Sequence, residues 1–173
     1  MTRAALLTTV MMLAIFLSSG VAWAAMIRCD GGVCRGTNSG DQMNGSARSD
    51  RMYGLAGIDV MNGNRDNDLM YGGGAADRMF GGYGNDRIYG QYLNDMIDGG
   101  PASDRIFGGS GRDTLYGGTG NDFIFAADNQ FDSIDCGGGA DVAVIDFEED
   151  QMSLNVPLID YITLTRCETI RYG

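Results

Sequence analysis

Large apolar residues recur every nine positions along most of this chain, with polar stretches between them. Ten consecutive nine-residue units run from Gly36 to Phe125, and each unit begins with glycine. Because side chains alternate along a strand, positions seven to nine predict a short strand whose middle residue faces a core. The first six positions, rich in glycine, asparagine and serine, predict a turn. The expected core residues are Met43, Met52, Met61, Met70, Met79, Ile88, Ile97, Ile106, Leu115 and Ile124.

Two units predict one flattened coil of 18 residues, in the order turn, strand, turn, strand. Successive coils would stack as parallel strands about 4.8 Å apart, so ten units give about five coils and a rod core of roughly 24 Å. A fixed period of this kind decides the fold class. We therefore predict an all-β solenoid built from nonapeptide repeats.

An aspartate occupies the sixth position of every unit, at the end of each predicted turn. Carboxylates about 5 Å apart repel by roughly 3 kcal/mol per neighbour at an effective dielectric near 20, so successive turns need a cation between them. Oxygen ligands on a flexible backbone, in a chain without histidine, favour calcium over magnesium, which demands tighter octahedral geometry. Odd and even units form two columns: Asp41, Asp59, Asp77, Asp95 and Asp113, and Asp50, Asp68, Asp86, Asp104 and Asp122.

The units resemble the Gly-Gly-x-Gly-x-Asp-x-U-x nonapeptide of the RTX, or haemolysin-type calcium-binding, proteins, in which U is large and apolar. The segments 81–89 and 117–125 match it best, and the resemblance covers roughly residues 36–144. It implies a parallel β-roll with several calcium ions, each held by aspartate carboxylates and main-chain carbonyls of two turns one coil apart. The ligands it implies are Asp50, Asp59, Asp68, Asp77, Asp86, Asp95, Asp104, Asp113 and Asp122, with Gly72, Gly81, Gly82, Gly84, Gly99, Gly108, Gly109, Gly111, Gly117, Gly118 and Gly120.

Some turns depart from this pattern at positions two and four. The turns 36–41 and 45–50 lack both of these glycines. In the turn that begins at Gly63, Asp66 stands at a glycine position, and in the turn that begins at Gly90, Gln91 and Leu93 replace both glycines. A side chain at these positions must accept a strained backbone or shift the ligating carbonyl. We expect better sites from Gly72 to Asp122 and weaker or empty sites toward the N-terminal end, and about eight ions for a full set of regular turns.

The N-terminal segment has the features of a secretory signal. A short basic start precedes an apolar run over residues 4–18, and Ala22-Trp23-Ala24 fits the small-x-small cleavage pattern. We expect a signal peptide at 1–24, an N-terminal cap at 25–35, the roll at 36–144 and a C-terminal cap at 145–173. The mature chain then has no membrane span and is secreted, extracellular or at the cell surface; an uncleaved anchor is the alternative.

The four cysteines flank the repeats, which agrees with export. Four cysteines allow three pairings, and position favours Cys29–Cys34 and Cys136–Cys167. Zinc is the alternative, but it would have to gather four thiolates from opposite ends of a rod.

The net charge of −11 makes nucleic acid a poor partner. It also fits disorder, which we expect without a counter-ion, although the in-register apolar position argues against disorder throughout. The absence of histidine removes the commonest general base, and a carboxylate that recurs in every unit indicates ion binding, so we expect no enzyme activity.

Position nine should face outward, and in the even units it is always aromatic. Arginines at position seven, at residues 51, 87 and 105, flank this strip. It either stabilises the sheet surface as an aromatic ladder or serves as a binding strip for a glycan, a protein or a second copy. The strip consists of Tyr53, Tyr71, Tyr89, Phe107 and Phe125. The sequence thus predicts a structural or surface protein whose folding is coupled to calcium, with an adhesin-like module as the alternative.

Overall fold

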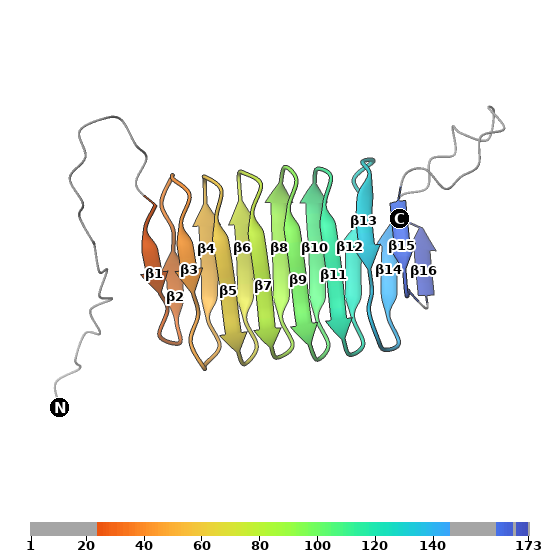
Figure 1. The fold of residues 1–173 in the computed structure, drawn as a ribbon, viewed down its shortest axis with the longest axis horizontal. Coiled ribbons are helices and arrows are strands. Elements are labelled where there is room, and N and C mark those ends of the chain that lie inside the picture. The colour runs from red at the N-terminus through yellow and green to blue at the C-terminus, as the bar shows by residue number, and fades with distance from the viewer. Residues whose placement is uncertain (1–23, 146–161, 168, 173) are drawn as a thin grey trace.

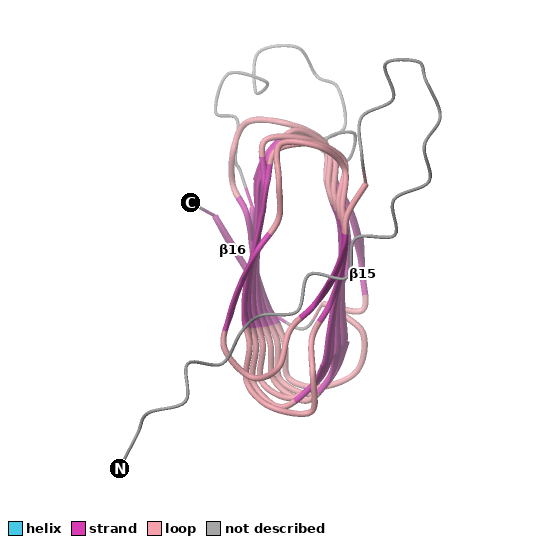
Figure 2. Cartoon of the chain, turned by 90° about the vertical axis from the view of Figure 1, so that its left-hand side faces the viewer, coloured by secondary structure: helices cyan, strands magenta, loops and turns pink. Residues whose placement is uncertain are grey.

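Two parallel β-sheets of eight strands each form the part of the chain that the structure describes, and successive strands alternate between the two sheets (Figure 1). The computed structural model describes residues 24–145, 162–167 and 169–172. Viewed along the stack, each coil is flattened, with the two sheets facing each other and turns at both edges (Figure 2). This is the all-β parallel solenoid predicted from the nine-residue period.

We call the two sheets odd and even after their strand numbers. The odd sheet contains β1 (Met26–Arg28), β3 (Gln42–Asn44), β5 (Val60–Arg65), β7 (Arg78–Tyr83), β9 (Met96–Pro101), β11 (Thr114–Thr119), β13 (Asp132–Asp135) and β15 (Ile162–Thr165). The even sheet contains β2 (Val33–Arg35), β4 (Arg51–Leu55), β6 (Leu69–Gly73), β8 (Arg87–Tyr92), β10 (Arg105–Ser110), β12 (Phe123–Ala126), β14 (Val142–Ile145) and β16 (Thr169–Tyr172).

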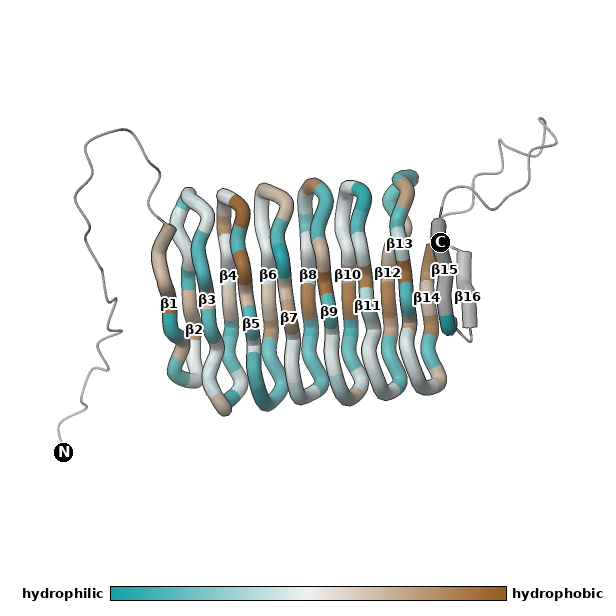
Figure 3. Tube along the Cα trace, in the orientation of Figure 1, coloured by the Kyte–Doolittle hydropathy of each residue, from teal (hydrophilic) through white to brown (hydrophobic). Residues whose placement is uncertain are grey.

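The core is the row of eighth-position residues, as the sequence predicts. All ten are at most 1% exposed. The strand register pairs each core residue with the core residue one coil away: Met52 pairs with Met70, Met70 with Ile88, and Ile88 with Ile106. Most hydrophobic segments accordingly lie within the strands, while the turns are mainly polar (Figure 3). Each coil therefore buries its apolar residues against its neighbours, which is how a solenoid builds a continuous core.

The ends of the chain add strands to the same two sheets. β1 and β2 precede the first repeat, and β15 and β16 pair with β13 and β14. Both expected disulfides, Cys29–Cys34 and Cys136–Cys167, are present, so the described cysteines offer no thiolate to zinc. The expected signal peptide, apart from its last residue, and residues 146–161 of the expected C-terminal cap lie outside the described residues. Within the described residues, no helix has the length and hydropathy to cross a bilayer.

Candidate metal centre

The sixth-position aspartates end the turns and point into the coil, where all ten are at most 3% exposed. One carboxylate oxygen, Oδ1, joins successive coils. The backbone N–H of Asp68 donates to Oδ1 of Asp86, and that of Asp86 donates to Oδ1 of Asp104, each at 2.7 Å. The same bond recurs at a separation of 18 residues along both edges, which confirms the two predicted columns.

Both columns continue past the regular repeats. The backbone N–H of Asp113 donates to Asp132, and that of Asp122 donates to Asp141, in each case across 19 residues. The extra residue after the tenth unit is therefore absorbed without breaking either column. Asp132 and Asp141 are not among the ligands expected from the sequence, although they follow Asp122 at spacings of ten and then nine residues.

The second carboxylate oxygen, Oδ2, has no hydrogen-bond donor in the eight turns that end at Asp59 to Asp122, within the described part of the chain. A buried carboxylate oxygen without a donor is costly while the group is charged. One such atom would be a local defect, but eight at equivalent positions define a property of the repeat. Each carboxylate needs either a proton or a cation at that point.

The first glycine of the unit makes room for this oxygen. A Cβ at Gly81 would lie within 3.0 Å of both Oδ2 of Asp86 and the carbonyl oxygen of Gly99, one coil further on. The same two kinds of oxygen crowd Gly63, where the neighbours are Asp68 and Gly81. A carboxylate oxygen and a main-chain carbonyl oxygen from adjacent coils thus converge beside these glycines, and these are the donors that calcium prefers.

From Gly54 onward, the turns that lack glycine at position two keep the backbone conformation of the regular turns at that position. Gln91 and Leu93 have φ of 83° and 68°, in the left-handed region that Gly82 and Gly84 occupy in the preceding turn. Of the two outcomes expected for these turns, the structure therefore shows the strained backbone. Leu55 and Ala102 adopt it too, with φ of 81° and 96°, which the sequence analysis did not foresee.

Burial raises the pKa of the eight column aspartates from Asp59 to Asp122 well above their ordinary value of 3.8. Desolvation is the largest cause in every case from Asp59 to Asp122, and the hydrogen bond from the amide one coil earlier opposes it. The pKa rises to about 8 for Asp95 and Asp104, where neighbouring carboxylates add to the effect. It rises to about 7 for Asp59 and Asp68, and to about 6 for Asp77, Asp86, Asp113 and Asp122. At neutral pH, protons and cations therefore compete for these oxygens.

A model of the family described as the RTX calcium-binding nonapeptide repeat matches the chain at residues 35–70, 44–79, 71–101 and 89–124. These matches together span more than half of the sequence. The chain belongs to the RTX family. A search of curated proteins gave no match. The RTX repeat is a calcium-binding repeat, so the cation implied by the aspartate columns is calcium.

The residues present fit the calcium of an RTX roll. Oδ2 of the aspartates from Asp59 to Asp122 would contribute to its coordination, together with main-chain carbonyls of the adjacent turns. Bound calcium would supply positive charge between carboxylates that otherwise repel. The assignment of particular glycine carbonyls from Gly72 to Gly120 stays a prediction.

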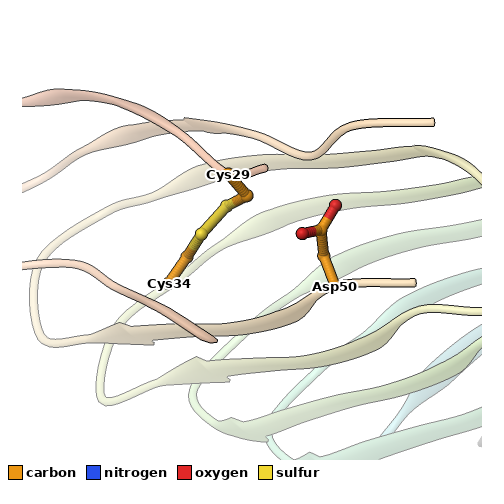
Figure 4. A group of neighbouring side chains, drawn as sticks. All are labelled: Cys29, Cys34 and Asp50. Carbon is orange, nitrogen blue, oxygen red and sulfur yellow. A yellow bond between two sulfur atoms is a disulfide. The ribbon is translucent and has the colours of Figure 1, made fainter. Parts of the chain in front are cut away.

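Among the described residues, one further group of possible metal ligands combines the N-terminal disulfide with an aspartate. Cys29, Cys34 and Asp50 lie close enough to suggest a metal-ligand group (Figure 4). The two sulfurs are bonded to each other, and the carboxylate of Asp50 already accepts hydrogen bonds from Gly32 and Ser46. This group is therefore a packed corner of the first coils and offers no thiolate ligand.

The outward aromatic residues of the even sheet form a continuous stack. Ring centroids lie 5.1 Å apart for Tyr53 and Tyr71, 4.8 Å for Tyr71 and Tyr89, and 4.7 Å for Tyr89 and Phe107, with planes within 10° of parallel. Phe125 continues the row with a tilted ring. The inner rings cover one another's faces, so the strip presents mainly ring edges to the outside.

Proposed function

We propose that this protein is a secreted calcium-gated β-roll with a structural or surface role and no catalytic activity. At low calcium the acidic columns oppose compaction. At extracellular, roughly millimolar calcium, the cations neutralise the turns and lock successive coils together. The single observation that carries this proposal is the row of buried Oδ2 atoms without donors from Asp59 to Asp122.

Two further observations support export. The first 24 residues have the pattern of a signal peptide, and the described cysteines all form disulfides, which persist in oxidising compartments. The regular recurrence of the carboxylates supports a role without catalysis, because catalysis needs one special pair rather than a set of equal ones.

Far-ultraviolet circular dichroism with calcium and with excess chelator tests the coupling. We expect the β-sheet signal to develop with calcium and to be largely lost on chelation at neutral pH. A full β-sheet signal in chelator would contradict calcium-coupled folding.

A second candidate function is adhesion through the outer face of the even sheet. From β2 to β14 no strand of this sheet contains an aspartate or glutamate, although the chain as a whole is strongly acidic. Arg51, Arg87 and Arg105 are exposed there beside the aromatic row, and Arg35 lies over the ring of Tyr53. Stacked rings leave little face for a neutral sugar, so the arginines favour an acidic polysaccharide.

Binding to dextran sulfate in calcium, with neutral dextran for comparison, tests this second function. We expect Arg87→Gln with Arg105→Gln to weaken binding, whereas Arg78→Gln on the odd sheet leaves it unchanged. Replacing Tyr71 and Tyr89 by serine tests the aromatic part of the strip. Equal binding of all these variants would remove the adhesin alternative.

A further inference from the structure

In the first two turns of the roll, the hydrogen bonds to the aspartate carboxylate differ from those in the eight turns that follow. In Asp41, Oδ2 accepts the backbone N–H of Thr37 at 2.6 Å and its hydroxyl at 3.1 Å. In Asp50, Oδ2 accepts the backbone N–H and hydroxyl of Ser46 at 2.7 and 3.0 Å. The oxygen that has no donor in later turns is therefore held by two donors in each of these turns.

The cause is the residue at position two of the unit. A hydroxyl residue stands there in both turns, and its oxygen also accepts the N–H of position four, from Ser39 in one turn and Arg48 in the other, each at 3.1 Å. Neither position two nor position four has positive φ in these turns, whereas position two has positive φ in each of the eight later units. The hydroxyl at position two thus holds the turn against the aspartate carboxylate of the same unit. The same arrangement occurs in two successive units.

The other carboxylate oxygen in these turns is also satisfied. The backbone N–H of Ala25 donates to Oδ1 of Asp41 at 2.9 Å, and that of Gly32 donates to Oδ1 of Asp50 at 3.0 Å. Hydrogen bonds to both oxygens stabilise the charged carboxylate without a metal. A cation at these positions would have to displace two donors and would meet a turn whose carbonyls follow a different backbone path.

We propose that Thr37 and Ser46 close the first two turns against calcium and make them a metal-independent end of the roll. The backbone N–H groups of Asp41 and Asp50 donate to Oδ1 of Asp59 and Asp68, both at 2.7 Å. The closed turns therefore present a fixed donor to the first calcium-dependent turn of each column. In a solenoid, where each coil contacts only its neighbours, such an end is a template on which the next coil orders. The inference rests on the proposed calcium-coupled folding for the later turns.

Calcium stoichiometry of two matched variants tests the closed turns. Asp50→Asn and Asp86→Asn replace the same position of the same column, two coils apart. By isothermal titration calorimetry we expect Asp50→Asn to bind as many ions as the native protein, and Asp86→Asn to bind at least one fewer. An equal loss of ions in the two variants overturns the proposal, as does an equal absence of effect.

Hydrogen exchange in chelator tests the metal-independent end separately. We expect amides of residues 36–53 to exchange about tenfold or more slowly than those of the matched coil 72–89, because hydrogen bonds to charged groups are the stronger kind. Calcium should protect only the second segment further. Ser46→Gly with Thr37→Gly should remove the early protection, and Ser46→Thr, which keeps the hydroxyl, should retain it.

Equal exchange of the two segments in chelator, or protection of both at the same calcium concentration, overturns the proposal. Its failure is distinguishable from failure of the proposed function. A native protein that keeps all its coils in chelator contradicts calcium-coupled folding, whereas a native protein that loses every coil together contradicts only the metal-independent end.

Discussion

At the scale of single residues, the fixed glycine at the start of each unit is explained by space. In the unit that begins at Gly81, a methyl group would occupy the point where Oδ2 of Asp86 and the carbonyl oxygen of Gly99 converge. The glycine therefore leaves space for two oxygens that favour a cation, in addition to allowing the backbone conformation of the turn.

The first prediction follows from this crowding. Gly81→Ala should lower calcium affinity about tenfold or more, since the added carbon must displace a ligating oxygen. Gly74→Ala is the matched control, because its Cβ would meet only the carbonyl oxygen of Leu55 at an ordinary 3.6 Å. Calcium titration by calorimetry checks the pair. Equal affinities in the two variants would show that the space beside Gly81 plays no part in binding.

The raised pKa values predict how the metal-free protein responds to pH. Asp95 and Asp104 have a folded pKa of about 8 against an ordinary value of 3.8, with desolvation as the main cause. A group whose folded pKa is raised contributes its full stability below its ordinary pKa and loses it as pH rises through the folded pKa. In chelator, the far-ultraviolet β-sheet signal should therefore be retained near pH 5 and be lost as the pH rises toward about 9.

With saturating calcium the urea midpoint should instead change little between about pH 9 and about pH 5, because calcium takes the place of the protons on Oδ2 in the folded state. The midpoint should fall only as the pH approaches the ordinary pKa of 3.8, where the unfolded chain takes up protons that the calcium-bound state does not. Calcium binding at neutral pH should also release protons, which calorimetry in buffers of different ionisation enthalpy measures. A chelated protein that is more stable at the alkaline end would contradict this account of the columns.

At the scale of the elements, the aromatic stack predicts a contribution to sheet stability. Tyr71 has stacked rings on both sides, so Tyr71→Ser should destabilise the calcium-loaded protein by about 1–3 kcal/mol beyond the lost burial. Tyr116→Ser is the control, since Tyr116 holds the same repeat position on the odd sheet but pairs in register with Asp98 and Asp135. Urea unfolding measures both, and equal effects would mean that stacking adds nothing.

The sequence predicted strands, core and columns because each depends on a strict period. Met70 and Ile88 lie at position eight, which faces the core. The period of 18 residues per coil determines which aspartates are neighbours. The closed turns were not predicted, because nothing in the period distinguishes a hydroxyl that bonds to Asp50 from one that faces solvent. The left-handed backbone of Leu55 was missed for a related reason: stacking on the next coil, rather than local preference, holds it there.

At the scale of the whole molecule, the two disulfides close loops of different length at opposite ends of the rod. Cys136–Cys167 joins residues 31 apart in sequence, and Cys29–Cys34 joins residues 5 apart. On the chain-entropy estimate, replacing the C-terminal pair by serine should cost about 4 kcal/mol, and replacing the N-terminal pair about 2 kcal/mol. Urea unfolding in calcium measures the two double variants. A larger loss from the N-terminal pair would contradict the loop-length argument.

Calcium between successive turns of both columns is what should hold the coils of this roll together. The most direct measurement is a crystal structure grown in calcium, with an anomalous difference map collected at long wavelength. We expect peaks beside Oδ2 of Asp86, Asp104 and Asp122, and none beside Asp41 and Asp50. Well-ordered turns at Asp86, Asp104 and Asp122 without anomalous peaks would contradict the central claim.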